Sequence, residues 1–521
     1  MARINTNIPS LIAQSNLTRS NQELEVRLER LSTGLRINRG KDDPAGLIIS
    51  ERIGTDLAGI DQAIKNSERA SSVIATTEGA LSEISDLLNS IKGLMVQSAN
   101  SGAISDEEIA ANQNQIDSAI ESITRISNTA TFGGLRLLDG SLDYVTSGLV
   151  NNEIRTASIL GASFVGSNSL QVDVDVIASA QKGALYLNGD NPGAAPDGVL
   201  LSSTTLQIAG RLGVVEVTIS SGRPLSELVT AVNSRSSQTG VQAALINGDA
   251  NSGIVFRSVD YGSDAFVSVK RVGGPPDPAD SPFAIYKFDG NADLPDISAG
   301  FPWSGIGTSL VAATRDEGRD VQALINGSLA TGDGLNVSLN ETNLSVELLL
   351  DETFATTPAG AASTFHITGG GALFQLGQDI TALQQSNIGI GSMSASNLGG
   401  SYINGAVQYL SSLKFGQTNS LENSADQKDF TAASEILEKA IDEVATLRGR
   451  LGAFERNVLE TNVRSLQSQF ENLTASRSQI VDADFAEETS KLTRAQILQA
   501  AGTSVLQLAN QQAQSVLQLL G

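Results

Sequence analysis

The chain has 521 residues, enough for about two to four domains, and 40% of them are hydrophobic, as in ordered proteins. Cysteine is absent and aromatic residues make up 4%, which excludes disulfides and leaves Leu, Ile, Val and Ala to build the core. The net charge of −23 argues against nucleic acid and against an anionic membrane surface as partners.

The start of the sequence gives no targeting signal. MARINTNIPSLIAQSN holds neither a continuous apolar segment nor a small-residue cleavage site, so we expect no cleaved signal peptide. No run in the chain reaches the ~18 apolar residues of a membrane-spanning helix, so we expect no membrane segment. Two interpretations stay open: a cytosolic protein, or one exported without a cleaved signal. The missing cysteines fit a reducing cytosol and equally a chain that must be threaded.

A heptad stripe of leucines predicts an amphipathic helix near the start, with polar Asn21 in register. Its members are Leu17, Leu24, Leu28, Leu31 and Leu35. The stretch LSTGLRINRGKDDPAG then interrupts the helical pattern. Gly34, Asn38 and Gly40 are suited to a helix end, where left-handed conformations are tolerated. Asp43 and Pro44 form a helix start, with Asp43 as the cap and Pro44 at the first helical position.

Two more helices follow in the N-terminal part. A stripe running from Ile53 to Met95 predicts a long helix, and SDEE begins a third helix over about 105–128. From there the period changes to two residues, which predicts strands over 170–176, 214–220 and 335–350. A short helix is expected over 225–233. The pentapeptide ALING occurs at 244–248 and again at 323–327, a faint internal repeat.

The C-terminal part is helical again. One apolar stripe runs over 437–473, and a last helix from about 484 is apolar on most of its circumference. Its main stripe includes Ile497, Val505, Leu508, Val516 and Leu519. The stripes from Ile53 to 473 are expected to form an intramolecular bundle. The two extreme ends, 17–35 and 497–520, would leave a large apolar face exposed if paired only with each other, so we expect them to pack between molecules.

The charge distribution follows this division. The net charge is −5 over residues 1–140, −14 over 141–425 and −4 over 426–521. His366 is the only histidine, and Gly369–Gly371 lacks the Lys-Ser/Thr of a phosphate loop. Asp173 and Asp175 share a strand face, which we interpret as solvated. We therefore predict no enzyme, no cofactor, no metal site and no catalytic residues.

Several motifs resemble one known family. RINTNIPSL, LERLSTGLRINRGKDDPAGLIISERI, LMVQSAN and RISNTATFGGLRLLDG resemble the N-terminal region of bacterial flagellins, and the sequence from LGAFERNVLETN to the end resembles their C-terminal region. The resemblance covers about 1–140 and 430–521, and residues 206–269 resemble the IN-type module of flagellins and hook-associated proteins. It implies a mainly α fold: a helical-bundle, coiled-coil core from paired N- and C-terminal regions, with an inserted β-rich (α+β) outer region.

The resemblance also implies a domain plan and a function. Residues 1–42 with 480–521 would line the inner tube, 43–177 with 369–479 would form a helical rod with a small β part, and 178–368 would face outward as one or two subdomains, about 178–270 and 271–368. The ends would be disordered in the monomer and fold on assembly, which agrees with the poor nucleation of short helices. Residues Gly34 to Asp43 would be the spoke between shells. The acidic middle would keep filaments dispersed, a hypothesis from charge.

The family's role would be a self-assembling subunit of the extracellular flagellar filament for swimming motility. By resemblance its partners are further copies of itself, the export machinery, a chaperone, the cap and hook-associated proteins. The alternative is the hook–filament junction protein of the same family. An outer region with an enzymatic or an adhesin role is a different class that we keep open. In the patch read by the innate flagellin receptor, Leu94 fits, but Ser90 and Ser122 replace the family's Arg and Glu, which leaves that recognition open.

Overall fold

In a computed structural model the chain forms two compact units. Unit 1 comprises 1–71, 375–384 and 454–521, and unit 2 comprises 72–374 and 385–453. The structure describes residues 6–100, 102–164, 169–188, 198–200, 203–273, 285–288, 301, 303, 308–341, 343–357, 360–403, 406–427 and 429–520, without the side chains of 426, 427 and 513–520. The three-part domain plan from the sequence remains a prediction beside this division.

The helices lie mostly where the sequence predicts them. In chain order they are α1 Ile8–Thr33, α2 Pro44–Ser98, α3 Asp106–Thr129, α4 Leu225–Asn233, α5 Ser236–Thr239, α6 Glu352–Ala355, α7 Leu421–Gln427, α8 Thr431–Phe454, α9 Glu460–Val481 and α10 Phe485–Leu520. The α2 helix contributes its residues up to Ser71 to unit 1 and the rest to unit 2. The capping box at Ser105 and Glu108 starts α3 as the SDEE signal predicts.

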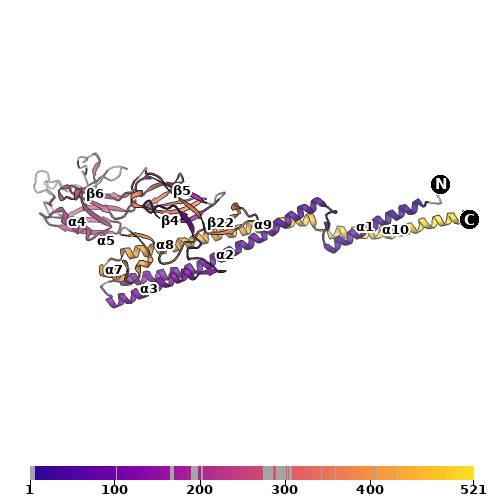
Figure 1. The fold of residues 1–521 in the computed structure, drawn as a ribbon, viewed down its shortest axis with the longest axis horizontal. Coiled ribbons are helices and arrows are strands. Elements are labelled where there is room, and N and C mark those ends of the chain that lie inside the picture. The colour runs from indigo at the N-terminus through magenta and orange to yellow at the C-terminus, as the bar shows by residue number, and fades with distance from the viewer. Residues whose placement is uncertain are drawn as a thin grey trace. The chain divides into compact units, whose positions relative to one another are not determined.

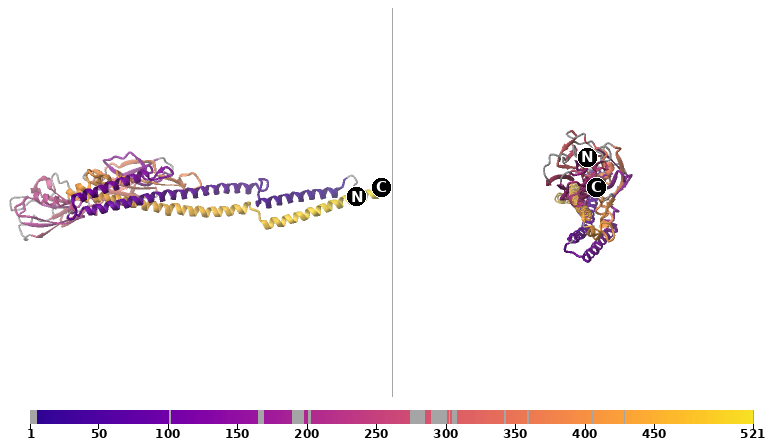
Figure 2. Two further views of the ribbon diagram at one scale, coloured as in Figure 1. Left: turned by 90° about the horizontal axis from the view of Figure 1, so that it is seen from below. Right: turned by 90° about the vertical axis from the view of Figure 1, so that its left-hand side faces the viewer.

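Unit 1 consists of two antiparallel helix pairs, α1 with α10 and α2 with α9 (Figures 1 and 2). Between α2 and α9, Ile60, Ala63 and Leu466 form a small buried core. Asn462 of α9 donates to Ser67 Oγ of α2 over 3.2 Å and to the Leu376 carbonyl over 2.8 Å. These hydrogen bonds anchor the 375–384 segment to this helix pair.

The helical part of unit 2 is built on the predicted apolar stripes. Ile74, Leu81, Ile84, Leu88 and Ile91 of α2 are fully buried, and so are the stripe residues of α3 and α8: Ile116, Ile120, Ile123, Leu437, Val444 and Leu451. The prediction of an intramolecular bundle is confirmed for these stripes. The buried Gln113 of α3 satisfies both ends of its amide, donating to the Leu413 carbonyl and accepting from Leu421 N–H.

The predicted stripe over 437–473 is not one regular α-helix. A π-helical turn over Glu455–Leu459 separates α8 from α9. A π-turn adds one residue to the helical ladder, and it shifts the apolar face. The sequence holds the sign of this shift, since the stripe ends at Val458 and starts again at the next residue, Leu459.

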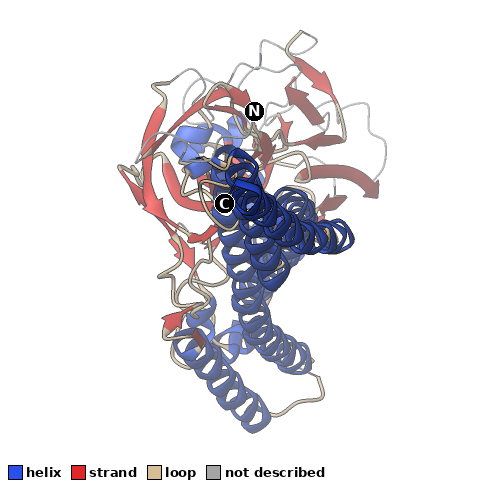
Figure 3. Ribbon diagram, turned by 90° about the vertical axis from the view of Figure 1, so that its right-hand side faces the viewer, coloured by secondary structure: helices blue, strands red, loops and turns tan. Residues whose placement is uncertain are grey.

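The strands of unit 2 form two β-rich bodies (red in Figure 3). The first packs the sheets β16-β15-β5-β20-β3 and β17-β18-β19-β4 around one core, and the second packs β13-β12-β6-β10-β9 and β14-β11-β7-β8 with α4 around another. Small two-stranded sheets join β1 with β2, β21 with β22 and β23 with β24. The inserted β-rich region is therefore confirmed, with α4 at the predicted helix.

The strand bounds are as follows. They are β1 Thr131–Phe132, β2 Leu135–Arg136, β3 Tyr144–Ser147, β4 Ile154–Ala162, β5 Leu170–Ala178, β6 Ala184–Leu187, β7 Thr204–Gly210, β8 Gly213–Ile219, β9 Val241–Leu245, β10 Ile254–Ser258, β11 Phe266–Gly273 and β12 Ile285–Phe288. They continue with β13 Leu310–Ala312, β14 Arg315–Glu317, β15 Gln322–Ile325, β16 Ser328–Leu329, β17 Thr331–Asp333, β18 Asn336–Asn340, β19 Leu344–Leu350, β20 Ser363–Gly370, β21 Ala372–Gln375, β22 Gln385–Ile388, β23 Ser401–Ile403 and β24 Ala406–Gln408.

The alternating run 335–350 forms two strands rather than one. β18 and β19 pair as an antiparallel hairpin, with Asn336 opposite Leu349 and Asn340 opposite Ser345. The run continues the apolar alternation on both sides of Glu341-Thr342-Asn343, so the pattern alone does not show the turn. The polar residues at this position supply it.

The repeated pentapeptide ALING adopts a similar backbone in both copies. Asn247 and Asn326 have φ of 54° and 51°, and Gly248 and Gly327 follow with φ of 69° and 83°. Asn and Gly tolerate this left-handed region, which is why an Asn-Gly pair closes tight hairpins. The second copy connects β15 to β16 in this way, while the first enters a short 3-10 turn.

Candidate functional site

The α1–α10 pair approaches closely because small residues line its contact. Ala13 of α1 and Ala495 and Ala509 of α10 are buried in it. At Gly502 a Cβ would lie 3.3 Å from Leu17 Cδ1, so a larger residue would press on that leucine. At the end of the pair where both termini lie (Figure 1), Asn7 Nδ2 donates to the Ala509 carbonyl over 3.1 Å.

A buried ion cluster joins the other end of the same pair. Glu488 of α10 is 4% exposed and accepts from Arg27 Nη1 at 3.0 Å and Arg30 Nη1 at 3.2 Å. Burial alone would raise the pKa of Glu488, but the hydrogen bonds and positive charges of the two arginines outweigh it, and the pKa lies below its ordinary value. The cluster therefore fixes the register of α1 against α10 through charge.

The outer faces of this pair expose large apolar side chains. Leu11 and Ile12 of α1 are 56% and 57% exposed, and Ile497 of α10 is 63% exposed. The full set on the two helices is Ile8, Leu11, Ile12, Leu28, Phe485, Ile497, Leu498, Val505 and Leu508. A two-helix element with only alanines buried between its helices has not satisfied its apolar residues. This face is the candidate interaction surface of unit 1.

The residues predicted from the stripes occupy different places on this surface. Leu17, Leu24, Leu31 and Leu35 are half-buried, whereas Leu28, Ile497, Val505 and Leu508 are exposed. The side chains of Val516 and Leu519 lie outside the described residues. The heptad pattern thus marks the side of α1 nearer to α10, while the exposed Leu11 and Ile12 lie outside it.

The predicted break after α1 is matched by a second break between α9 and α10 (Figure 2). Arg36 N–H donates to the Val481 carbonyl over 2.6 Å, and Ala483 N–H donates to the Gly34 carbonyl over 2.9 Å. Leu35 and Asp482 form an antiparallel bridge between these bonds. The two interruptions of the helices therefore pair with each other through the backbone.

The local geometry of the first break follows its sequence. Gly34 has φ of 73° and its N–H donates to the Arg30 carbonyl, which ends α1. Asp42 then closes the turn, accepting the N–H groups of Asn38 and Arg39, and these bonds lower its pKa. Unlike Gly34, neither Asn38 nor Gly40 adopts the left-handed conformation.

The start of α2 is the one that Asp43 and Pro44 predict. The helix begins at Pro44, and Asp43 Oδ1 accepts the Gly46 N–H over 2.9 Å. A Cβ at Gly46 would lie 2.6 Å from Asp43 Oδ2 and 2.7 Å from Ile37 Cδ1. Glycine at this position therefore lets the buried Ile37 pack against the start of the helix.

The residues compared with the innate-receptor patch lie in unit 2. Ser90 is exposed and Leu94 is half-buried one turn later on α2, and Ser122 is half-buried on α3. The side chains present here are one apolar group and two hydroxyls.

Sequence reasoning missed the ion cluster and the exposed residues at the start of α1. Arg27 and Arg30 are three residues apart, so they lie on one helical face, and Glu488 is in the first turn of α10. This spacing was available in the sequence. Nothing in the sequence pairs these residues across more than 450 positions.

The described residues contain no group of three His, Cys, Asp or Glu side chains that could hold a metal ion. His366 is half-buried in β20, opposite Gln171 of β5. Asp173 accepts hydrogen bonds from Gln171 and Thr364, which lower its pKa and occupy it locally. Among the helices that the structure describes, none combines the length and apolarity of a membrane span.

Comparison with known proteins agrees with the helical ends. The bacterial flagellin N-terminal helical region matches residues 4–143, the bacterial flagellin C-terminal helical region matches 434–520, and the flagellin hook IN motif matches 203–260. The B-type flagellin of Pseudomonas aeruginosa is 30% identical over 523 residues, and the flagellin of Salmonella typhimurium is 30% identical over 535 residues. Both alignments cover 99% of this chain and 99% of the relative.

Solved structures that resemble parts of the chain come from other flagellar proteins. The flagellar hook associated protein-3 of Legionella pneumophila covers 82% of this chain and 98% of its own, at a TM-score of 0.30 and 12% identity. The D2-D3 domains of the flagellar cap protein FliD from Escherichia coli cover 42% of this chain and 96% of theirs, at a TM-score of 0.26 and 19% identity. The full-length sequence relatives decide the family: the chain belongs to the bacterial flagellins, a structural protein family rather than an enzyme family.

Proposed function

We propose that this chain is a filament subunit that self-assembles through α1 and α10 into the flagellar filament used for swimming. The observation that carries the proposal is the apolar face of the α1–α10 pair. Its membership of the flagellins supports the proposal, since that family contributes components of the flagellar filament.

The energetics of this face favour association. Complete burial of a large aliphatic side chain is worth roughly 1.5–3 kcal/mol, and the exposed residues named above are each about half exposed. Covering five of them would therefore contribute on the order of 5 kcal/mol per subunit, before the entropic cost of association. In a polymer each subunit contacts several neighbours, so this contribution acts cooperatively.

The remaining assignments follow from the same proposal. Residues 1–42 with 480–521 form the inner shell, 43–177 with 369–479 form the rod, and 178–368 face outward. The exported subunit is extracellular and leaves the cell without a cleaved signal. Its partners are copies of itself, the export machinery, a chaperone, the cap and hook-associated proteins. The strongly acidic middle of the chain faces solvent, where like charges disperse filaments.

A seeded assembly experiment tests the proposal. Purified chain is mixed with short filament seeds and followed by sedimentation and electron microscopy. Long tubes are expected from the unmodified chain, and none from a triple variant with Ile497→Ser, Val505→Ser and Leu508→Ser. The matched control changes three exposed polar positions of the same helix, Gln496→Ser, Thr503→Ser and Gln507→Ser, and is expected to elongate normally.

Two outcomes would change the interpretation. Normal elongation by the apolar triple variant would remove the α1–α10 face from the assembly mechanism. A full chain that stops at short rings would point instead to the hook–filament junction role. Circular dichroism of each variant shows whether unit 2 keeps its fold, so loss of assembly is not confused with unfolding.

A further inference from the structure

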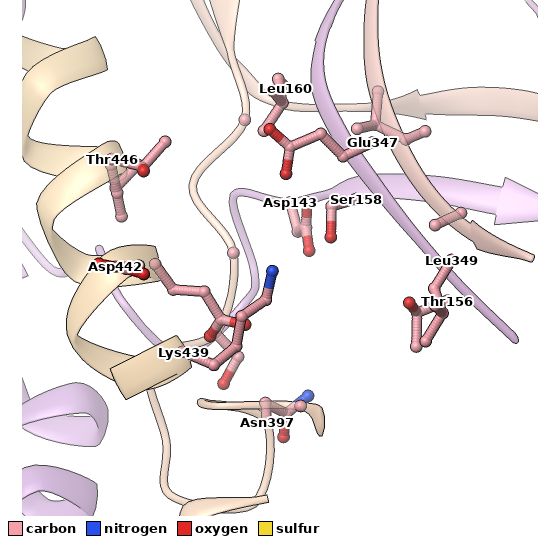
Figure 4. Close-up of a pocket in the computed structure, with 18 of the residues that line it drawn as sticks. Asp143, Thr156, Ser158, Leu160, Glu347, Leu349, Asn397, Lys439, Asp442 and Thr446 are labelled. Carbon is pink, nitrogen blue, oxygen red and sulfur yellow. The ribbon is translucent and has the colours of Figure 1, made fainter. Parts of the chain in front are cut away.

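Unit 2 contains a cavity of about 370 Å³ between α8 and the first β-rich body. Its walls come from α8, from β4 and β19, and from the segment 389–400 that precedes β23. Figure 4 shows Lys439 and Asp442 on the helix, with Asp143, Ser158 and Glu347 across the cavity from them. The flagellin assembly surface described above does not include these residues.

Six charged side chains line this cavity at two levels. Asp143, Glu443 and Arg450 are half-buried, and we call them the floor. Glu347, Asp442 and Lys439 are exposed, and we call them the rim. With four carboxylates and two cations, the cavity carries a formal charge of −2 at neutral pH.

The floor groups are held by the backbone rather than by each other. Glu443 Oε2 accepts the Gly399 N–H over 2.9 Å, Asp143 Oδ1 accepts the Tyr144 N–H over 2.7 Å, and the Arg450 guanidinium donates to the Leu160 carbonyl. Among these six described residues no ion pair forms. Opposite charges therefore line one cavity without neutralising one another.

Unneutralised carboxylates inside a cavity are costly. Burial raises the pKa of Asp143 and of Glu443, although backbone hydrogen bonds partly offset the effect. Folding nevertheless orients both groups toward space that a ligand can occupy. A bound cation would lower the cost of keeping them ionised at neutral pH.

The arrangement does not suit a single metal ion. A divalent cation needs several carboxylate oxygens around one point, and no three acidic side chains of the described chain are gathered closely enough. Here the negative charge is instead spread over floor and rim. A ligand that matches it carries two separated positive charges on a flexible apolar stem.

We propose that this cavity binds a small linear organic diamine. One ammonium group is held at the floor by Asp143 and Glu443, and the other at the rim by Glu347 and Asp442. The charge of −2 matches a dication. Lys439 stands at the rim and repels ligands with further positive groups, which limits the number of amines. Because the ligand contacts α8 together with β4 and β19, its binding stabilises unit 2 by mass action.

Titration calorimetry and thermal unfolding of the full chain with 1,4-diaminobutane test the proposal. We expect one site per chain and a higher unfolding temperature of unit 2. Glu443→Gln and Asp143→Asn should each weaken binding about fivefold or more, the size of one charge contact near a protein surface. Lys439→Gln should strengthen it, a gain that an unfolded variant cannot imitate.

Controls separate a defined site from general attraction to an acidic protein. Glu83→Gln removes one negative charge from an exposed position of α2 outside the cavity and should leave binding unchanged. Equal binding by the wild type and both floor variants would overturn the proposal, as would several weak sites per chain. Butylamine, with one charge, should bind more weakly than the diamine, and calcium chloride should not compete at equal ionic strength. Effective competition by calcium would identify a metal site instead.

Discussion

The backbone N–H of Arg36 donates to the carbonyl oxygen of Val481 over 2.6 Å, so the chain after α1 is joined to the chain after α9. Two residues further on, the Ala483 N–H returns to the Gly34 carbonyl. The interruptions of the N-terminal and C-terminal helices thus form one paired joint within unit 1. The candidate assembly surface lies on the helices that follow this joint.

Glu488→Gln is expected to loosen the α1–α10 pair. The substitution leaves Arg27 and Arg30 without a carboxylate, and hydrogen bonds to charged groups of this kind are worth roughly 1–3 kcal/mol. Amide hydrogen exchange over Ile8–Thr33 should therefore be faster. Glu487→Gln, which removes only an exposed ion pair with Lys491, is the control and should change little. Unchanged exchange in α1 would show that the cluster does not hold the pair.

The effects of two glutamate substitutions should depend on pH with opposite signs. The pKa of Glu488 is lowered, so its stabilisation is present above the ordinary value of 4.5 and is lost as pH falls through the folded value. The loss caused by Glu488→Gln should therefore disappear in acid. The pKa of Glu443 is raised, so its ionisation destabilises the fold as pH rises through that value. Glu443→Gln should stabilise unit 2 at pH 7 and be neutral in acid, measured by urea unfolding at several pH values.

Two glycines of unit 1 should respond oppositely to alanine. At Gly34 a Cβ would meet nothing within 4 Å, so the cost of Gly34→Ala is the left-handed backbone alone, roughly 1–2 kcal/mol. Gly54 lies inside α2, where a Cβ would make ordinary contact with Arg477 at 3.7 Å. Gly54→Ala should stabilise by about 0.5–1 kcal/mol. Hydrogen exchange in unit 1 distinguishes these signs, and equal effects would contradict the backbone explanation.

Asn326→Ala is expected to destabilise the β15–β16 hairpin. The change removes the hydrogen bonds of the Asn326 side chain with Asp173 N–H at 2.8 Å and the Gln171 carbonyl at 3.2 Å, and places alanine at φ of 51°. We expect a loss of about 2 kcal/mol in the free energy of unfolding. Asn326→Gly keeps the backbone freedom and should lose less.

The other copy of the pentapeptide provides the control for this prediction. Asn247 has the same backbone conformation, but its side chain makes one hydrogen bond, to Ser252 Oγ at 3.3 Å. Asn247→Ala should therefore cost less than Asn326→Ala in the same urea titration. If the two variants lose equal stability, the backbone conformation dominates and the side-chain bonds to Asp173 and Gln171 contribute little.

The sequence predicted those parts of the fold that local periodicity controls. The stripe through Ile74, Leu81 and Leu88 specifies which side of α2 is buried, because a helix repeats its faces every 3.6 residues. Asp43 and Pro44 specify the start of α2 because each has a local preference. The apolar character of α10 likewise indicated a surface that an isolated chain does not cover.

Features that depend on distant residues could not be predicted in the same way. The pairing of Leu35 with Asp482 and the contacts of Glu488 bring together residues from opposite ends of the chain. The π-turn after Phe454 depends on how α8 and α9 must each direct their apolar faces. The cavity beside α8 is defined by a helix, two strands and a loop, so its charged residues form no recognisable motif in the sequence.

The paired joint has a consequence for how the ends of such a chain can change over time. Its hydrogen bonds use main-chain atoms, so replacing the side chains of Leu35, Arg36 or Val481 removes none of them. Adding or deleting one residue within α1 is different, because it rotates everything beyond it by about 100° and advances it by about 1.5 Å. The apolar face would then no longer align with that of α10. The terminal helices can therefore vary widely in composition while keeping their length, measured from the joint, nearly fixed.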